Sequence, residues 1–478
     1  MSASDFLAGD GALASHLGGF QPRTQQQEMA DRIESIIDAS GVLVVEAGTG
    51  VGKTFAYLVP AIESGKRVII ATGTKNLQDQ LFHNDLPVIR KAMSLPVTVS
   101  LLKGRSNYLC QHRLEMHINA GSANNRHLHE LEIIHDWAGR TTSGDIAEVD
   151  DIEEGSMVWS LATSTIENCL GQECEYYDDC YVLQARRKAQ SADIVVINHH
   201  LLFADLSLKE RGFGDILPGA DVFIIDEAHQ LPEIAGDFFG FSLTSRQLYN
   251  LASDARTEHL KESGSLHELP PELDKLEQSI ADLRLSMGQT GQRFSWDELQ
   301  TVARNFPDYL QVLQLNLQSV TDWLAQAAER SKGLDNCYRR SLGLLQHLQS
   351  FGSNTDDEDD ELFDHVRWAD TSRRGFGLHS TPLNIDEIFQ AHMSDLQASW
   401  VFTSATLAVG DNFSHFCTRL GLKEPQTLLL GSPFDYRNNG LKYLPKGLPE
   451  PSDPSYTREV CAQSIPVIEA AGGRTFML

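Results

Sequence analysis

The sequence predicts an α/β fold, and three observations support this. Short apolar runs that are typical of buried parallel strands recur at 42–45, 67–72, 97–101 and 192–198, with helical patterns between several of them. The first run breaks into a glycine-rich loop followed by a helical pattern, which is the order of a βα unit. A later run, ADVFII, ends in two adjacent carboxylates, so polar groups follow strand ends, where ligands of open α/β sheets bind.

The stretch VLVVEAGTGVGKT, residues 42–54, predicts a phosphate-binding loop. Its glycines let the backbone turn N–H groups toward a phosphate chain, and the helix that opens at Lys53 adds its positive end. Lys53 would reach the β and γ phosphates, and Thr54 would place its hydroxyl on Mg²⁺. The strict pattern begins with glycine, so Ala47 indicates the AxTGxGKT variant. The residues expected to bind ATP here are Ala47, Gly48, Thr49, Gly50, Val51, Gly52, Lys53 and Thr54.

The stretch ADVFIIDEAH, residues 220–229, provides the second half of this predicted site. Its strand ends in Asp226 and Glu227, close to where the strand before the glycine-rich loop ends. Asp226 suits the Mg²⁺ water shell, and Glu227 suits activation of an attacking water. We therefore expect Lys53, Asp226 and Glu227 to be the catalytic residues of ATP hydrolysis.

Upstream of the loop, Arg23 and Gln26 have the RxxQ spacing of an element that reads adenine. A side-chain amide can offer both a donor and an acceptor to the edge of the base. The start of any polar helix would look similar, so the two interpretations stay open.

Length and charge set limits on the function. A chain of 478 residues is expected to form about two to four domains, or one with large insertions. With 39 basic and 66 acidic residues, the formal charge of −27 argues against wholesale wrapping of nucleic acid, so any such contact must be local. No signal peptide or membrane span is indicated, so we expect a cytoplasmic protein without a membrane partner.

Hydroxyl residues follow the second strand, where Thr72 and Thr74 could hold a nucleic-acid phosphate. Capping of the next helix by Thr74 is an equally good interpretation and is compatible with the first. The paired His199 and His200 follow another strand without a third metal ligand in spacing, so we expect a structural role for them.

Four of the seven cysteines form a candidate metal site. Cys169, Cys174 and Cys180 have the spacing C-x4-C-x5-C, and Cys110 is their distant partner. Four thiolates could hold a [4Fe–4S] cluster or a structural zinc. Zinc usually uses paired CxxC motifs, so we favour the cluster, with zinc or no metal as alternatives. The other three cysteines are expected to be buried or idle thiols.

From about residue 238 to 392 the pattern becomes helical and the strand signals vanish. Apolar residues from Leu310 to Ala327 recur at gaps of three and four, which predicts a helix packed on another that bears Leu342, Leu345 and Leu348. The acidic run DDEDDE, 356–361, is expected to be a solvated loop.

Taken together, these motifs resemble one family: the iron–sulfur DNA helicases of superfamily 2 related to the XPD protein, and within it the bacterial DinG and YoaA branch. The matching segments are AGTGVGKT at 47–54, TGTKNLQDQL at 72–81, KGRSNYLC at 103–110, VINHHLL at 196–202, DEAH at 226–229 and SATL at 404–407, with the cysteine triplet. Their order and spacing cover nearly the whole chain. The cysteine positions and the NHH segment favour the YoaA-like branch.

The resemblance implies a RecA-like motor domain interrupted by an iron–sulfur domain and by a helical Arch domain. The implied parts are motor domain 1 at 1–102, 191–237 and 393–410, the iron–sulfur domain at 103–190, the Arch-like insertion at 238–392 and the start of motor domain 2 at 411–478. His229, the last residue of DEAH, is then expected at the ATP site.

The resemblance also implies ATP-driven 5′→3′ translocation on single-stranded or forked DNA, in DNA repair or replication. The expected DNA contacts are Lys103 and Arg105 of the KGR segment and Tyr108 for base stacking, together with Thr72 and Thr74. The expected cofactors are ATP, Mg²⁺ and a [4Fe–4S] cluster.

Family members continue into a second RecA-like domain whose arginines complete the ATP site, and no such segment follows in this sequence. We therefore expect a C-terminally truncated chain that hydrolyses ATP poorly and unwinds nothing. The alternative function is a nucleotide- and DNA-binding module without turnover. A third interpretation is an RNA-directed DEAH protein with a zinc site.

Overall fold

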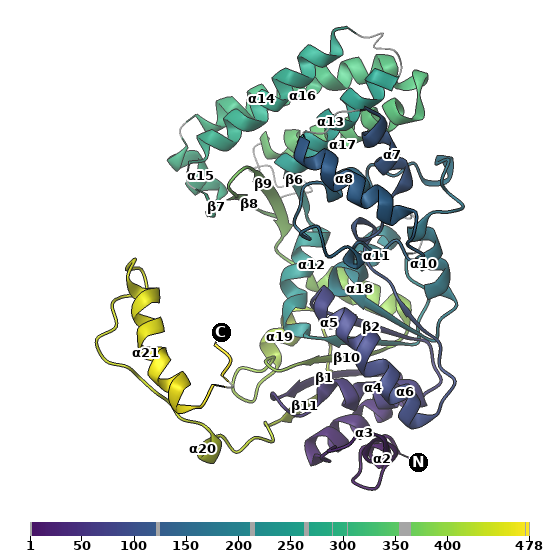
Figure 1. The fold of residues 1–478 in the computed structure, drawn as a ribbon, viewed down its shortest axis with the longest axis vertical. Coiled ribbons are helices and arrows are strands. Elements are labelled where there is room, and N and C mark those ends of the chain that lie inside the picture. The colour runs from purple at the N-terminus through teal and green to yellow at the C-terminus, as the bar shows by residue number, and fades with distance from the viewer. Residues whose placement is uncertain are drawn as a thin grey trace. The chain divides into compact units, whose positions relative to one another are not determined.

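The computed structural model describes residues 2–120, 125–210, 216–261, 267–288, 290–303, 305–352, 365–473 and 475–477. The chain forms two compact units, Met1–Ser432 and Pro433–Leu478 (Figure 1). The acidic run at 356–361 lies outside the described residues.

A seven-stranded parallel sheet forms the centre of the first unit, which confirms the predicted α/β class. Its strands are β1 (Val42–Ala47), β2 (Val68–Thr72), β3 (Val99–Leu101), β4 (Ile194–Asn198), β5 (Val222–Asp226), β10 (Ser399–Ser404) and β11 (Gln426–Leu430). Their order in the sheet is β11-β1-β10-β5-β2-β4-β3. Because all strands run the same way, their carboxyl ends meet at one edge.

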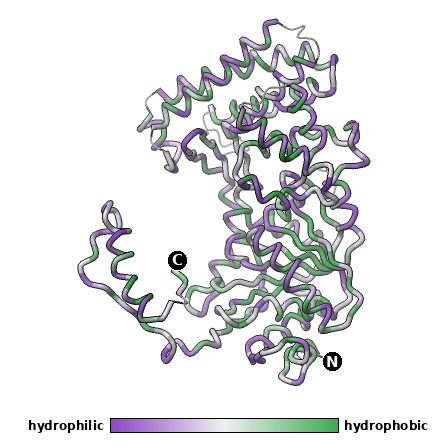
Figure 2. Tube along the Cα trace, in the orientation of Figure 1, coloured by the Kyte–Doolittle hydropathy of each residue, from purple (hydrophilic) through white to green (hydrophobic). Residues whose placement is uncertain are grey.

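Alternating residues of these strands enter two hydrophobic cores, one on each face of the sheet. Leu43 and Val45 of β1 face the core built with α3 (Thr24–Ala39), α4 (Lys53–Glu63) and α6 (Leu86–Met93). Val44 faces the core built with α11 (His199–Glu210), α12 (Leu231–Phe239), α18 (Asp386–Leu396) and α19 (Ser414–Arg419). Figure 2 shows hydrophobic residues running along the strands. Helices therefore cover both faces, and the strands are apolar on both sides.

Two long insertions leave this sheet. The first, between β3 and β4, contains all four cysteines of the predicted metal site and packs around its own small core, which includes Leu131, Ile134 and Trp159. Its helices are α7 (Gln111–Ala120), α8 (Asn125–Ala138), α9 (Trp159–Ala162) and α10 (Tyr181–Gln190). We call it the cysteine insertion.

The second insertion lies between β5 and β10, and we call it the helical insertion. Its long helices are α13 (Ser245–Lys261), α14 (Leu269–Ser286), α16 (Phe306–Ala327) and α17 (Lys332–Gly352), with the shorter α15 (Trp296–Val302). The expectation that strands vanish here is wrong, because an antiparallel sheet of order β6-β9-β8-β7 supports the helices. Its strands are β6 (Phe241–Thr244), β7 (Arg293–Ser295), β8 (His365–Thr371) and β9 (Phe376–Pro382). They are short and bury mainly one face, so their apolar residues alternate with polar ones and give only a weak signal in the sequence.

The predicted apolar stripe of α16 is buried from Leu310 to Ala327 and packs in one core with α17. Leu345 and Leu348 of α17 are buried as predicted, whereas Leu342 is exposed. Residues such as Leu334 and Cys337 complete the buried face instead.

The boundary placed after residue 410 also differs from the structure. Helix α19 and strand β11 belong to the first unit, where β11 pairs with β1, and the division falls after Ser432. The second unit contains α20 (Tyr436–Asn439) and α21 (Tyr456–Ala470). The remaining short helices, α1 (Ala3–Phe6), α2 (Ala12–His16) and α5 (Lys75–Gln80), lie in the first unit. Across the described helices, none has the length and apolar character needed to span a membrane.

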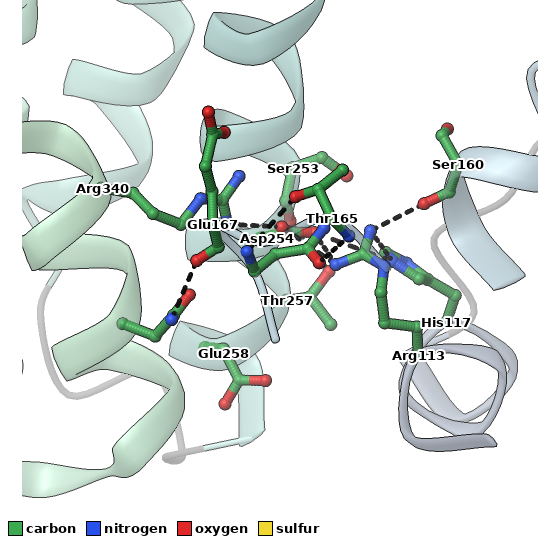
Figure 3. Close-up of polar contacts among 12 residues, drawn as sticks. Arg113, His117, Ser160, Thr165, Glu167, Ser253, Asp254, Thr257, Glu258 and Arg340 are labelled. Carbon is green, nitrogen blue, oxygen red and sulfur yellow. Dashed lines mark hydrogen bonds and ion pairs between the residues drawn. The ribbon is translucent and has the colours of Figure 1, made fainter. Parts of the chain in front are cut away.

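One buried carboxylate joins the two insertions. Asp254 on α13 accepts hydrogen bonds from Arg113 on α7, at 3.0 Å, and from Arg340 on α17, at 2.7 Å (Figure 3). The second guanidinium nitrogen of Arg113 donates to the carbonyl oxygen of Ser160 at 2.8 Å. All three charged side chains of this joint are almost completely buried.

The pKa values in this joint follow from the same contacts. Burial alone would raise the pKa of Asp254, but the guanidinium groups of Arg113 and Arg340 hold it below its usual value. Burial and the neighbouring Arg113 lower the pKa of His117 to about 4, so this histidine is neutral at pH 7. The joint therefore holds one carboxylate between two guanidinium groups.

We expect Asp254→Ala to destabilise the protein by about 3–5 kcal/mol, because it leaves two buried guanidinium groups without their carboxylate. The exposed pair between Asp335 and Arg339 provides the matched control, and Asp335→Ala should cost less than about 1 kcal/mol. Urea denaturation followed by circular dichroism measures both. Equal effects of the two substitutions would show that Asp254 does not hold the insertions together.

Candidate functional site

The predicted phosphate-binding loop lies at the carboxyl edge of the parallel sheet. Strand β1 ends at Ala47, and α4 begins at Lys53. Between them, Gly50 and Gly52 have φ values of 88° and 86°, in the left-handed region that glycine adopts without steric cost. The side-chain hydroxyl of Ser432 donates to the carbonyl oxygen of Thr49 at 2.8 Å. Ser432, the last residue of the first unit, therefore helps to hold the loop in its folded conformation.

Arg23 and Gln26 contact this loop directly. Nη1 of Arg23 donates to the carbonyl oxygen of Gly50, and Nε2 of Gln26 donates to that of Gly52 at 3.0 Å. Both side chains thus hold the backbone of the loop. Their role in reading adenine stays a prediction.

The catalytic candidates converge beside the loop. Nζ of Lys53 lies 3.3 Å from Oε1 of Glu227, which follows β5. The hydroxyl of Tyr57 donates to Oδ2 of Asp226 at 3.1 Å. Glu227 has a φ of 55°, which is uncommon for a residue with a side chain and is typical of functional sites. Burial raises the pKa of Asp226 to about 6, although Lys53 opposes this rise.

A third strand end, that of β10, completes the cluster. The hydroxyl of Ser404 donates to Oε2 of Glu227 at 3.3 Å and lies 2.8 Å from Nδ1 of His229. The same histidine nitrogen lies 3.4 Å from Oε2 of Glu227. Side chains from the ends of β1, β5 and β10 therefore form one connected network, as expected for adjacent parallel strands.

His199 has the structural role that the sequence predicts. It is fully buried, and its Nε2 lies 2.8 Å from the carbonyl oxygen of Asp226. Burial lowers its pKa to about 4, so the neutral ring can donate to this carbonyl. His199 thereby ties the end of β4 to the end of β5.

Three of the five predicted DNA contacts are wrong, because their side chains are buried. Lys103 is 4% exposed and pairs with Asp79 at 2.9 Å and Asp145 at 2.8 Å. The hydroxyl of Tyr108 accepts a hydrogen bond from the backbone N–H of Lys103 at 3.1 Å, and Thr72 is 1% exposed. The cysteine insertion folds over the end of β3, and this tertiary contact has no signature in the local sequence.

The other two predicted contacts, Thr74 and Arg105, line a cavity of about 540 Å³ at the sheet edge. Thr74 also caps α5, since its hydroxyl oxygen accepts from the N–H of Leu77 at 3.3 Å. Further polar residues line this cavity that were not predicted to contact DNA, among them Lys75, Arg186, Asn198 and His200. Asn198 and His200 could have been inferred from their place at the end of β4, whereas Arg186 on α10 gives no local signal.

Cys110, Cys169, Cys174 and Cys180 line a second cavity, of about 430 Å³. None of them is in a disulfide. Nη1 of Arg105 donates to Sγ of Cys169 at 2.9 Å, and the N–H of Gly171 donates to the same sulfur at 3.3 Å. Among the residues that the structure describes, no three His, Cys, Asp or Glu side chains converge on a point where one metal ion would sit.

This cysteine cavity fits the donor set of an iron–sulfur cluster. Four thiols from one insertion line it, and hydrogen bonds reach one of the sulfurs, a contact that tunes the sulfur ligands of such clusters. The other cysteines lie elsewhere: Cys337 is buried, Cys417 is partly buried and Cys461 is exposed.

Comparison with known proteins agrees with this geometry. A family model described as DEAD/DEAH box helicase matches residues 23–129, and one described as DEAD_2 matches residues 78–248. An ATP-dependent DNA helicase YoaA of Escherichia coli strain K12 is 42% identical over 482 residues, covering 99% of this chain and 74% of that protein. The YoaA protein of Haemophilus influenzae is 41% identical, covering 98% of this chain and 72% of that protein.

Among solved structures, an XPD helicase aligns with 86% of this chain and 62% of its own, at 15% identity and a TM-score of 0.45. The family assignment rests on the YoaA relatives, whose alignments cover 99% and 98% of this chain. The chain belongs to the XPD/DinG family of helicases, and it is an ATP-hydrolysing enzyme.

Proposed function

We propose that this protein is an ATP-driven motor that moves 5′→3′ on single-stranded or forked DNA in the cytoplasm, in DNA repair or replication. The observation that carries the proposal is the network of Lys53, Glu227 and Ser404 at the ends of three adjacent strands. The YoaA relatives are named ATP-dependent DNA helicases, and this supports DNA as the nucleic-acid substrate.

The proposed ATP site uses the loop between β1 and α4. The backbone N–H groups of the loop and the amino end of α4 would hold the phosphates, with Lys53 as the mobile cation. Thr54 and Asp226 would hold Mg²⁺, which supplies further positive charge at the phosphates when bound. Lys53 pairs with Glu227 at 3.3 Å, so bound phosphates would compete with Glu227 for Lys53 and would release this carboxylate.

Released in this way, Glu227 would accept a proton from the attacking water. Ser404 and His229 contact its second carboxylate oxygen and would hold it in place. The strained backbone of Glu227 fixes the direction of the side chain. Hydrolysis would therefore depend on the end of β10 as well as on the DEAH segment.

We expect Glu227→Gln to lower DNA-stimulated phosphate release by about 100-fold or more, since the amide cannot accept the proton of water. Nucleotide binding should remain, because Lys53 and the loop are intact. Lys53→Ala should instead abolish nucleotide binding. Glu28 on α3 is exposed and forms no hydrogen bond or ion pair with the residues that the structure describes, so Glu28→Gln is the matched control. A module without turnover would release no phosphate in any of these variants.

The proposed DNA path runs through the sheet-edge cavity that Thr74 and Arg105 line. Arg186 lines the same cavity, and burial together with nearby Arg105 lowers its pKa. Two guanidinium groups near each other would attract a phosphate chain, although the chain as a whole carries a net charge of −27. The local cations therefore provide the site that the overall charge does not.

We expect Arg186→Ala to weaken single-stranded DNA binding and to lower the slope of log affinity against log salt by about 1. Arg187 is the neighbouring, exposed arginine outside this cavity, and Arg187→Ala should leave both quantities nearly unchanged. Fluorescence anisotropy at several salt concentrations measures the DNA binding. Equal losses for Arg186→Ala and Arg187→Ala would place the DNA elsewhere.

The variant Lys103→Met should destabilise the protein by about 3 kcal/mol, because it leaves Asp79 and Asp145 without their buried cation.

We also propose that the four cysteines of the cysteine insertion hold one [4Fe–4S] cluster. The cluster would crosslink the segments around Cys110 and around residues 169–180, and so stabilise the wall of the DNA path. Arg105, which lines both cavities, would connect the two sites.

We expect anaerobically purified protein to contain about four iron and four sulfide per chain, with broad visible absorbance. Cys180→Ser should lose most of the iron, whereas Cys461→Ser, which changes an exposed cysteine outside the cavity, should keep it. Stoichiometric zinc without sulfide would contradict the proposal.

A further inference from the structure

Glu46 is an acidic residue in an otherwise apolar strand. It lies on β1, directly before the phosphate-binding loop, and its side chain points to the same face of the sheet as Val44. The backbone of Glu46 is paired with Ser404 on β10 and with Leu429 on β11. A charged side chain in such a central strand requires partners, because an unpaired one would be costly.

Its partners are two consecutive backbone N–H groups. Oε2 of Glu46 accepts from the N–H of Leu407 at 2.6 Å and from that of Ala408 at 2.7 Å. Hydrogen bonds to an ionised carboxylate are shorter and about twice as strong as neutral ones. These two residues directly follow the segment Ser404–Thr406, where the chain leaves β10 and turns. Glu46 therefore fixes the path of the chain just after Ser404.

We propose that Glu46 is a positioning residue for ATP hydrolysis, acting through Ser404. This inference rests on the proposed function, in which Glu227 accepts the proton of water. Glu46 anchors Leu407 and Ala408 to the strand that carries the phosphate-binding loop. Ser404 is thereby kept where its hydroxyl reaches Glu227 at 3.3 Å and His229 at 2.8 Å.

The geometry separates this role from nucleotide binding. The side chain of Glu46 accepts hydrogen bonds from the turn after β10. Lys53 instead pairs with Glu227 of the DEAH segment, and Gln26 donates to the loop. Loss of Glu46 should consequently disturb Ser404 and leave the phosphate-binding loop folded. The expected signature is a change in kcat without a change in the KM for ATP.

The test compares Glu46→Ala and Glu46→Gln with the control Glu28→Gln in the full chain. The amide oxygen of glutamine can still accept from both N–H groups, whereas alanine leaves them without an acceptor. DNA-stimulated ATPase gives kcat and KM, and hydrogen–deuterium exchange of the peptide that spans residues 405–409 reports on the turn.

We expect Glu46→Ala to lower kcat by roughly 10-fold, to leave the KM for ATP within about 2-fold, and to speed exchange at Leu407 and Ala408. Glu46→Gln should keep kcat within about 3-fold of the unchanged protein and keep exchange slow. The control should change neither quantity.

Three results would overturn the inference. One is an unchanged kcat in Glu46→Ala in a protein that hydrolyses ATP. Another is a raised KM with an unchanged kcat, which would place Glu46 at the nucleotide. The third is an equal loss in Glu46→Gln and Glu46→Ala, which would show that charge, and not the acceptor geometry, matters. An absence of ATP hydrolysis in the unchanged protein would instead contradict the proposed function itself, and the inference with it.

Discussion

The ion pair between Lys53 and Glu227 connects the two halves of the candidate site, at 3.3 Å. It can form only because β1 and β5 are parallel and separated by one strand, β10, so that their carboxyl ends meet. Each group neutralises the other, which lowers the cost of keeping both charges partly out of water. In the proposed function, a triphosphate would change this balance because it is a stronger partner for the lysine than one carboxylate is. Nucleotide binding would then also release Glu227 to act as the base.

Buried charge is also what fastens the insertions in place. Asp254 joins the cysteine insertion to the helical insertion through two arginines, and Lys103 joins the cysteine insertion to α5 through Asp79. Because Arg113, Arg340 and Lys103 are buried in these ion pairs, their positive charges do not contribute to the protein surface. In a chain with a net charge of −27, the proposed DNA path would therefore depend on other cations near the sheet edge, such as Arg105 and Arg186.

The sequence predicts the parallel sheet well, because apolar strands are local patterns, and the structure brings Lys53 and Glu227 together at its carboxyl edge as the motifs lead us to expect. The position of Asp226 and Glu227 at the sheet edge could be predicted because they stand at the end of an apolar strand in the sequence. Lys103 and Tyr108 were misassigned because their burial depends on an insertion that folds back over β3, and nothing within the KGRSNYLC segment encodes that contact. The contacts of Glu46 could not be predicted from the sequence for the same reason, since its partners are more than 350 residues away along the chain. The strands β6 to β9 were missed because one-sided strands alternate apolar and polar residues over few positions.

A crystal structure of this protein with Mg²⁺ and a non-hydrolysable ATP analogue tests most directly whether nucleotide takes Lys53 from Glu227. We expect Nζ of Lys53 to leave Glu227 and to lie about 3 Å from the phosphate oxygens, with the metal beside Thr54 and Asp226. We also expect Glu227 to keep its contact with Ser404. An analogue bound away from residues 47–54, or a Lys53 that stays on Glu227 with the phosphates in the loop, would contradict this exchange of partners.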